Sequence, residues 1–411
     1  MVGAMLRDVV VVGASLAGLR AAETLRTDGY DGRLTIIGAE AHLPYDRPPL
    51  SKKVLAGEWE PDRIQLRKEH EYQDLDFDLR LGTRAESLDL GARSIRLTDG
   101  DAVTYDGLVI ATGALPRRLP GHRLVPGLFE LRSLDDSLAL RAALDAGPRR
   151  VVVIGAGFIG AEVAATARQR GLEVTLVEAL EQPLVRGVGP LVGAAFAGLH
   201  RAHGVDVRLG VGVDVIEGEE AVERVRLSDG AVVEADVVVV GIGVAPATAW
   251  LEDSGLGVRD GVVCDAHLGA GPPGVYAAGD LVRWPNGAFD GEEMRIEHWT
   301  NAAEQGAAAA RNLLAWSAGL PPTPYAPVPF FWSDQYEARI QCLGRAGAGD
   351  HVAVVHGSLD EPSFLALYGR GGRLRGVVGV SLPRLVMPYR KHLAAQMSWD
   401  DALAYARQQE G

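Results

Sequence analysis

Two glycine-rich turns carry residue types and spacings that suit dinucleotide binding. The clearer one has Gly155, Gly157 and Gly160 directly after the apolar residues 151–154, with Glu178 roughly 20 residues further on. In such a turn the first glycine makes the tight bend, the second lets backbone approach a pyrophosphate, and the third lets a helix pack on the strand. Such glycine turns also occur for purely structural reasons. The strand, helix, second strand and terminal acid around this one favour a nucleotide site.

The acid at the end of the second strand predicts which nicotinamide cofactor is used. Glu178 is placed to accept a hydrogen bond from a ribose 2′-hydroxyl, whereas the 2′-phosphate of NADPH would meet its negative charge. Residues 179–181 add no arginine that would receive that phosphate. The pyrophosphate would face the start of the helix at Phe158 and Ile159. We therefore expect NADH rather than NADPH at this turn.

A second turn of the same kind opens the chain. The apolar residues 9–12 run into the turn and helix start, which comprise Gly13, Ser15, Leu16, Ala17 and Gly18. Ser15 stands where the middle glycine is usual, and its Cβ makes the phosphate approach tighter although its hydroxyl can donate to phosphate. The next apolar strand, residues 34–37, leads to Glu40, the ribose acid that we expect here.

The two turns belong to a repeated module. Short strands and turns over residues 79–113 recur over residues 210–243, with Asp99-Gly100 echoed by Asp229-Gly230 as hairpin signals. One chain therefore holds two dinucleotide sites, and the fold class is α/β.

Segments outside the two glycine turns supply further candidate residues and mark the end of the repeated module. The loop at residues 44–53 has three prolines, so we expect no regular structure there, and its Arg47 and Lys52 are either functional or solvated. Residues 274–281 predict a strand that brings Asp280 to a helix start, where its carboxylate would either accept hydrogen bonds from polyol hydroxyls or cap the helix. Residues 301–316 predict a helix and residues 319–324 a linker. Later strands, and a final helix opened by a capping box at Ser398, indicate an interface domain.

Composition excludes several classes of protein. The 411 residues carry a net charge of −13 without a basic stripe, which argues against nucleic-acid binding. The only cysteines, Cys264 and Cys342, form no Cys-x-x-Cys pair, so we expect neither a local redox disulfide nor an iron–sulfur cluster. Unpaired thiols fit a reducing cytoplasm. No apolar run is long enough to span a membrane, and no metal site is expected.

The ordered motifs resemble a known family over nearly the full length. They are the two glycine turns, the 44–52 loop, residues 111–113, residues 275–280, residues 295–299 and residues 331–336. Together they are similar to the FAD-dependent ferredoxin reductases of bacterial oxygenase systems, of the putidaredoxin reductase and rhodocoxin reductase type.

The resemblance implies two cofactors and a set of contacts. FAD would occupy the first module and NADH the second, which is inserted into the first as in glutathione-reductase-like flavoproteins. The cofactor residues that it adds are Arg47, Lys52, Ala85, Ala111, Thr112, Gly113, Arg132, Gly243, Gly279, Asp280 and Trp299. It places Lys52 beside the flavin ring and Glu162 near the nicotinamide, so these two are the expected catalytic residues. Relatives have an aspartate where this chain has Ala39, and Glu40 would take the place of that aspartate here.

The expected domains follow from the same inserted arrangement. Residues 1–117 and 245–322 would bind FAD, residues 118–244 would bind NAD, and residues 323–411 would form the C-terminal α+β domain. The expected protein is a monomer or a weak homodimer.

The resemblance implies electron transfer to a partner protein. A hydride from NADH would reduce FAD, which would pass single electrons to a [2Fe–2S] ferredoxin serving a monooxygenase or Rieske dioxygenase. Basic residues are candidates for docking an acidic ferredoxin, namely Arg63, Arg67, Lys68, Arg390 and Lys391. Two alternatives stay open: an NADH oxidase or rubredoxin or quinone reductase, and an NADH-sensing flavoprotein similar to apoptosis-inducing factor.

Overall fold

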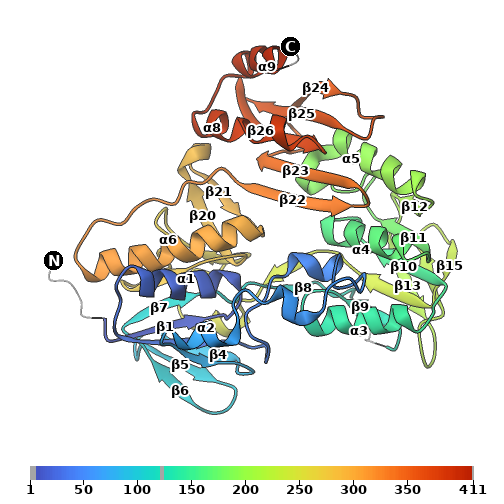
Figure 1. Cartoon of the computed structure of the whole chain (residues 1–411). Helices are drawn as coiled ribbons and strands as arrows, with labels where there is room; N and C mark the ends of the chain where they lie inside the picture. The colour runs from blue at the N-terminus through green and yellow to red at the C-terminus, as the bar shows by residue number, and fades with distance from the viewer. Residues whose placement is uncertain (1–5, 121–124, 410–411) are drawn as a thin grey trace. The chain divides into compact units, whose positions relative to one another are not determined.

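The computed structural model describes residues 6–120 and 125–409, which divide into two compact units (Figure 1). The first unit comprises the chain up to Asp46, Ile64–Leu115 and Ala245–Pro329. The second comprises Arg47–Arg63, Pro116–Val244 and the chain from Phe330 onward. The second unit groups the predicted NAD-binding and C-terminal domains, so the three-domain boundaries stay a prediction. Their parts at residues 1–5, 121–124 and 410–411 lie outside the described residues.

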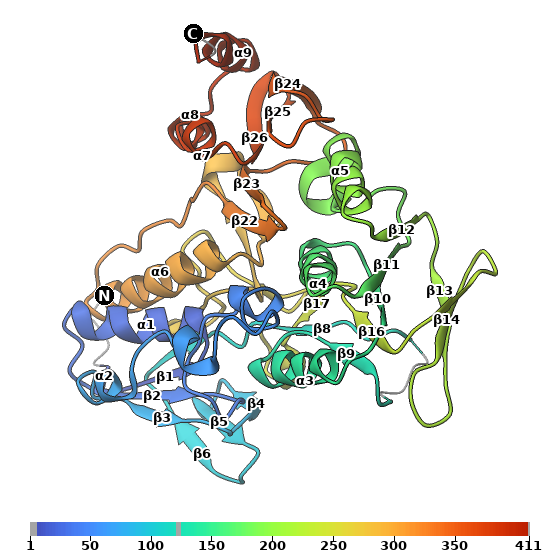
Figure 2. The same cartoon turned by 45° about the vertical axis from the view of Figure 1, so that its right-hand side comes forward.

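A five-stranded parallel sheet forms the centre of the first unit. Its strands, in spatial order, are β19 (Val275–Ala277), β7 (Gly107–Ile110), β1 (Asp8–Val12), β2 (Arg33–Ile37) and β3 (Asp78–Arg80). Buried valines, leucines and isoleucines fill the middle strands because both faces of the sheet are covered. One face carries α1 (Leu16–Thr27) and α6 (Trp299–Ser317), and the other carries the meander of β4 (Ala85–Asp89), β5 (Ser94–Leu97) and β6 (Ala102–Thr104) (Figures 1 and 2).

The second unit repeats this module. Its parallel sheet has the order β12 (Asp206–Leu209), β11 (Glu173–Glu178), β10 (Arg150–Ile154), β16 (Val237–Val240) and β9 (Leu128–Glu130). The meander is β13 (Val213–Glu217), β14 (Arg224–Leu227) and β15 (Val232–Glu234). Both meanders have a register shift in the first strand, at Ala85/Ser87 and at Val213/Val215. The repeat predicted from the sequence is confirmed, including its hairpin turns.

Helices of the second unit pack on this sheet. They are α3 (Leu134–Asp145), α4 (Phe158–Gln169) and α5 (Val185–Ala202). Small residues of α4 lie in the core against β10 and β11, whereas α5 bends where Gly189 adopts a φ of 72° before Pro190. The prediction that the prolines at 44–53 exclude regular structure is wrong in part. Pro48–Ser51 forms the 3₁₀ helix η1, because proline is compatible with the first turn of a helix.

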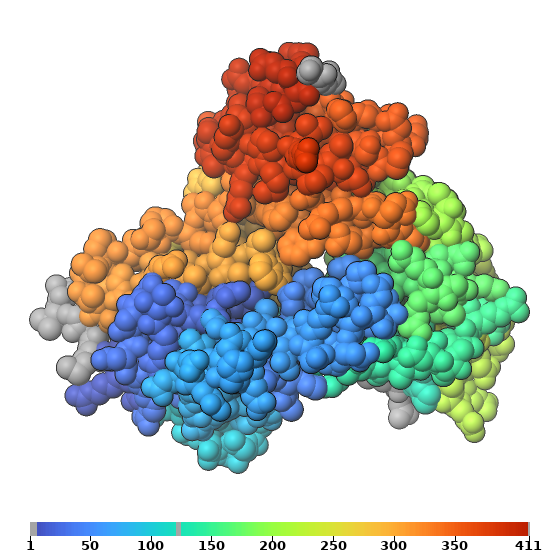
Figure 3. Space-filling view, in the orientation of Figure 1, coloured from blue at the N-terminus to red at the C-terminus, as the bar shows by residue number. Residues whose placement is uncertain are grey.

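An antiparallel sheet and three short helices complete the second unit. The sheet has the order β22 (Phe330–Gln335), β23 (Ala338–Gly344), β26 (Arg373–Val380), β25 (Phe364–Arg370) and β24 (His351–Gly357). The helices are α7 (Pro383–Val386), α8 (Tyr389–Ala394) and α9 (Trp399–Gln408), which Ser398 caps as predicted. The apolar face of α5 packs against this sheet, and Figure 3 shows the α5 region, in light green, abutting it.

The remaining elements are short. In the first unit they are α2 (Glu69–Gln73), η3 (Ala249–Leu251), β18 (Val262–Val263), β20 (Val282–Asn286), η4 (Gly287–Phe289) and β21 (Glu292–Arg295). The chain passes between the units in η2 (Pro61–Ile64), β8 (Ala114–Pro116) and β17 (Val244–Pro246). Across residues 6–120 and 125–409, no helix has the length and apolar character needed to cross a membrane.

Candidate dinucleotide sites

Each parallel sheet ends in a glycine turn of the same geometry. Gly13 follows β1 and Gly155 follows β10, with φ values of 119° and 98° that favour glycine. A Cβ added to Gly18 would lie 1.8 Å from the carbonyl oxygen of Gly13, and one added to Gly160 would lie 2.0 Å from that of Gly155. The last glycine of each turn is therefore required for the helix to lie against its strand.

The middle position of the second turn has a different reason to be glycine. Gly157 is the N-cap of α4 and has an ordinary φ of −72°, and a Cβ added there would meet no atom within 4 Å. Packing does not demand glycine here, so the open space fits the close approach of a pyrophosphate. Phe158 and Ile159 form the first turn of α4, and Ile159 is 47% exposed although it is apolar. The equivalent N-cap of α1 is Ser15, followed by Leu16 and Ala17.

Glu178 is fixed against the second turn by backbone donors. Its Oε2 accepts from the N–H of Ala156 at 2.7 Å, and its Oε1 accepts from the N–H of Leu180 at 2.9 Å. This carboxylate can accept a further bond from a ribose hydroxyl, whereas a 2′-phosphate would be repelled. The residues present therefore fit NADH.

Glu40 does not occupy the equivalent place in the first unit. Val12 pairs with Ile37 and Ile154 pairs with Val177, so Gly38 is the counterpart of Glu178. A Cβ on Gly38 would lie 2.6 Å from the Cβ of Ala14, which leaves no room for a longer side chain. Glu40 lies two residues further on, where the Tyr45 hydroxyl donates to its Oε2 at 2.5 Å. Its role at an adenosine ribose stays a prediction.

The carboxyl ends of β1, β7 and β19 gather further predicted residues at one edge of the first sheet. A Cβ on Gly13 would lie 2.0 Å from the oxygen of Ala111, and the Thr112 hydroxyl donates to the Ala247 oxygen at 2.8 Å. Gly279 donates its N–H to Gln305 at 2.8 Å and thereby brings Asp280 to this edge. Gly113, with a φ of 68°, ends the same segment, and Ala85 is buried at the start of β4. A nucleotide is expected at such an edge.

Trp299 begins α6 and is held by a residue that the sequence did not indicate. Its Nε1 donates to the Asp46 carboxylate at 2.6 Å. Asp46 lies in the proline-rich loop, and nothing in the sequence of that loop predicts a contact with Trp299. The indole is thereby oriented within the first unit.

Lys52 and Glu162, the two predicted catalytic residues, form an ion pair in the second unit. Lys52 Nζ lies 2.8 Å from Glu162 Oε2, and the Ser51 hydroxyl donates to the same oxygen at 2.5 Å. The Ser333 hydroxyl donates to Oε1 at 2.7 Å. The Glu162 carboxylate is only 3% exposed, and the Lys52 side chain is 17% exposed. Three donors therefore converge on a buried carboxylate. Sequence reasoning missed both serines.

The other predicted residues of the second unit are held through backbone groups. An Nη of Arg47 donates to the carbonyl oxygen of Arg132 at 2.7 Å. Gly243 has a φ of 100° and accepts from the N–H of Arg117 at 2.9 Å. Arg47, Lys52 and Arg132 belong to the second unit, whereas the other predicted FAD residues belong to the first.

Comparison with known proteins identifies the family. The model for pyridine nucleotide-disulphide oxidoreductases matches residues 7–306, and the reductase C-terminal model matches residues 330–409. The chain belongs to the pyridine nucleotide-disulphide oxidoreductase family. Rhodocoxin reductase of Rhodococcus erythropolis is 39% identical to this reductase over 394 residues, which cover 95% of this chain and 90% of the relative.

Two further relatives extend the comparison. The 5,5'-dehydrodivanillate O-demethylase ferredoxin reductase subunit of a Sphingobium species is 40% identical over 371 residues, or 89% of this chain and 88% of its own. The reductase in a crystal structure of a covalent putidaredoxin reductase–putidaredoxin complex has a TM-score of 0.89 and 34% identity, covering 95% of this chain and 93% of that one. This chain is thus an oxidoreductase, and its cofactors are FAD and NADH.

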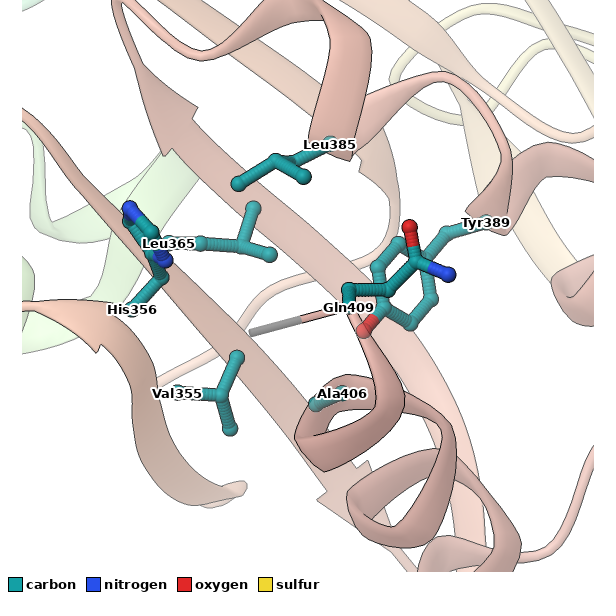
Figure 4. A pocket seen from close by; sticks show the side chains of 7 residues that line it. All are labelled: Val355, His356, Leu365, Leu385, Tyr389, Ala406 and Gln409. Carbon is teal, nitrogen blue, oxygen red and sulfur yellow. The ribbon is translucent and has the colours of Figure 1, made fainter. Parts of the chain in front are cut away.

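The reductase also has a small cavity in its C-terminal domain, which Figure 4 shows between β24, β25 and the terminal helices. Its volume of about 10 Å³ admits no more than a water molecule. Leu365, Tyr389 and Ala406 are among its lining residues, so it is a packing defect of this domain. Within residues 6–120 and 125–409, no three histidine, cysteine, aspartate or glutamate side chains are grouped as a metal site requires.

Proposed function

We propose that this reductase takes a hydride from NADH onto FAD and passes single electrons to a [2Fe–2S] ferredoxin that supplies a monooxygenase or a Rieske dioxygenase. The observation that carries the proposal is similarity over nearly the whole chain to a reductase captured with putidaredoxin, together with relatives named as ferredoxin reductases. When bound, FAD accepts a two-electron hydride and can release the electrons one at a time. The unpaired cysteines support a cytoplasmic location.

Two sets of residues would hold the cofactors. The FAD set is Gly13, Ser15, Leu16, Ala17, Gly18, Glu40, Arg47, Lys52, Ala85, Ala111, Thr112, Gly113, Arg132, Gly279, Asp280 and Trp299. The NADH set is Gly155, Gly157, Phe158, Ile159, Gly160, Glu162, Glu178 and Gly243. Helix N-termini bind the phosphates, and Glu178 selects the free ribose hydroxyl.

Lys52 supplies positive charge at the redox centre and Glu162 holds it in place. The ammonium group has a fixed position because Glu162 is buried and is itself held by two hydroxyl groups. A preorganised charge stabilises a reduced, anionic ring without reorganising during the reaction. We expect Lys52→Ala to slow flavin reduction by NADH about tenfold or more in stopped-flow measurements.

Lys53 provides a matched control for that variant. It is the next residue, and it pairs with Glu58 at 2.5 Å in a half-exposed position. We expect Lys53→Ala to leave flavin reduction unchanged. An unchanged rate of flavin reduction in Lys52→Ala would show that Lys52 takes no part in that step.

The proposed ferredoxin partner requires a docking surface with basic side chains. Because this chain carries a net charge of −13, an acidic ferredoxin must dock on a local basic patch of its surface. Arg67 is a weaker candidate than Lys68 because it bonds Glu23 and lies 3.8 Å from Glu71. The Arg63 guanidinium stacks over Trp59 at 4.5 Å, which keeps its charge available. We propose a monomer or a weak homodimer as the working form.

The experiment is NADH-driven cytochrome c reduction by the purified yellow protein, with and without a [2Fe–2S] ferredoxin, repeated with NADPH. We expect a rate that requires both the ferredoxin and NADH. Oxygen consumption that is indifferent to ferredoxin would instead indicate an oxidase. A long-lived reduced complex with an NADH-dependent change of mass would indicate a sensing flavoprotein.

A further inference from the structure

A line of polar side chains runs from Glu162 through the interior of the second unit. Ser333 donates to Glu162 Oε1 at 2.7 Å, and Gln335 Nε2 donates to the Ser333 hydroxyl at 3.3 Å. His200 Nε2 lies 3.2 Å from Gln335 Oε1, and His200 Nδ1 lies 3.0 Å from the Tyr336 hydroxyl. The line joins α4, β22 and α5 and ends at Tyr336, which is half-buried.

The middle of this line is fully closed to solvent. Ser333, Gln335 and His200 are each 0% exposed. A buried polar group without a partner is destabilising, so three neighbouring ones are retained only where each is hydrogen-bonded. The core around them is apolar and includes Phe196 and Val192 of α5. Packing alone would favour apolar side chains here, so the polar line needs another explanation.

Only one placement of hydrogens fits the whole line if it begins at an ionised Glu162. A carboxylate accepts only, so the Ser333 O–H points to it, and the Ser333 oxygen then accepts from the Gln335 amide. The Gln335 carbonyl must then accept from the N–H at His200 Nε2, which leaves Nδ1 to accept from the Tyr336 O–H. Every donor thus points toward Glu162.

The two outer groups suit these roles. Burial lowers the pKa of His200 to about 4, so the ring is neutral near pH 7 and can donate from one nitrogen and accept at the other. Burial raises the pKa of Tyr336, so its hydroxyl keeps its proton. His203, the C-cap of α5, stacks on the Tyr336 ring at 3.6 Å and lies 3.2 Å from Glu337, so it covers the outer end of the line.

We infer that Tyr336, His200, Gln335 and Ser333 form a hydrogen-bond chain of fixed polarity that orients the Glu162 carboxylate toward Lys52. The four are positioning residues, since only Glu162 contacts the lysine. The polarity follows from the contacts themselves, whereas its consequence for hydride transfer rests on the proposed role of Glu162 and Lys52.

The first test is ¹⁵N NMR of the FAD-loaded protein labelled at histidine. His200→Gln identifies the resonance by its loss. We expect a neutral ring with its proton on Nε2 that does not titrate between pH 5.5 and 8, and a shifted Nδ1 resonance in Tyr336→Phe. A proton on Nδ1 would reverse the Gln335 amide and direct the Ser333 hydroxyl away from Glu162, which would overturn the inference.

The second test measures flavin reduction by NADH in variants along the line. We expect Ser333→Ala to slow it about tenfold and Tyr336→Phe about twofold, because hydrogen bonds to charged groups are the stronger ones. Tyr368→Phe is the matched control, since its hydroxyl donates to the Val188 carbonyl oxygen at 2.6 Å in the same core and is not in the line. Equal slowing in all three variants would assign the line to packing and refute positioning.

Glu162→Gln separates the inference from the proposed function. If it leaves flavin reduction unchanged, the proposed role of Glu162 fails, while the His200 resonances still decide the polarity. If it slows reduction and Ser333→Ala does not, the proposed role stands and the positioning chain fails.

Discussion

The two nucleotide modules have the same backbone geometry at their glycine turns and differ in the side chains at positions proposed to face the ligand. A Cβ added to Gly18 or to Gly160 would lie 1.8 or 2.0 Å from the carbonyl oxygen of the first glycine of its turn. Both turns open with a positive φ. Ser15 stands at the position of Gly157, and Gly38 stands at the position of Glu178. Geometry that packs helix on strand is therefore kept in both, while the ligand-facing positions diverge.

The helices after the turns differ in the same way. Glu162 on α4 is 3% exposed and meets three donors, whereas its counterpart on α1, Arg20, is 39% exposed and pairs with Glu23. On α1 the covering element is α6, where a Cβ on Gly306 would lie 2.2 Å from the Ala17 oxygen. At this register α4 thus carries a buried carboxylate, whereas α1 carries a partly exposed arginine. The comparison teaches that the repeat specifies the fold, and that the two modules differ at positions proposed to face the cofactors.

The largest effect is expected where both modules agree. Gly160→Ala places a Cβ against backbone and should destabilise the second unit by more than about 3 kcal/mol, and Gly18→Ala should do the same in the first. Gly157→Ala meets open space, so it should change stability by less than about 0.5 kcal/mol and weaken NADH binding about tenfold. Thermal unfolding and NADH titration measure the two quantities. Equal unfolding temperatures for Gly157→Ala and Gly160→Ala would contradict the distinction between a packing and a ligand-facing glycine.

The next effect concerns the acid that only the second module has at this register. Glu178→Gln combined with Ala179→Arg should shift the ratio of kcat/KM for NADH over NADPH by about 100-fold toward NADPH, because repulsion is replaced by an arginine partner. Glu178→Gln alone should give about tenfold. Glu181→Gln, a neighbouring exposed acid, is the control and should leave the ratio unchanged. An unaltered protein that already used both coenzymes equally would show that Glu178 does not select.

The fold could be predicted from the sequence wherever the signal is local. Short stretches of sequence predict the apolar strands, the glycine turns, the Asp-Gly hairpins and helix α6, and the structure confirms them. Glu162 and Lys52 were indicated by resemblance, and their contact appears only when the chain folds, since they are 110 residues apart. His200 carries no local signal, and Ser333 lies in the 331–336 motif without any residue type or spacing that indicates its contact with Glu162. Glu40 was assigned by counting residues after a strand. The position equivalent to Glu178 is Gly38, and a side chain there would collide with Ala14.

A smaller effect distinguishes the second unit by its buried histidine. His200 has a folded pKa of about 4, below its ordinary value of about 6.5, so the unfolded chain binds a proton that the folded chain refuses. Stability is therefore unaffected above about pH 6.5 and should fall by up to about 3 kcal/mol as the pH drops from 6.5 to 4. Asp236 keeps its charge in this window, because Arg150 holds its pKa at about 2. Denaturant unfolding across this range should show the slope, and His200→Gln should flatten it.

The smallest effect is expected at the cysteines, one in each unit. Cys264 is 6% exposed in the core of the first unit, and Cys342 is 3% exposed on β23 of the second. Burial raises the pKa of both thiols, so neither forms the thiolate that exchanges with a disulfide. A thiol reagent should therefore leave NADH oxidation unchanged in the folded protein and react with two thiols per chain after unfolding. Since the family takes its name from disulphide reduction, rapid loss of activity in the folded state would show that a cysteine takes part. A retained rate would show that this chain keeps the two nucleotide modules of the family and transfers electrons without the disulfide.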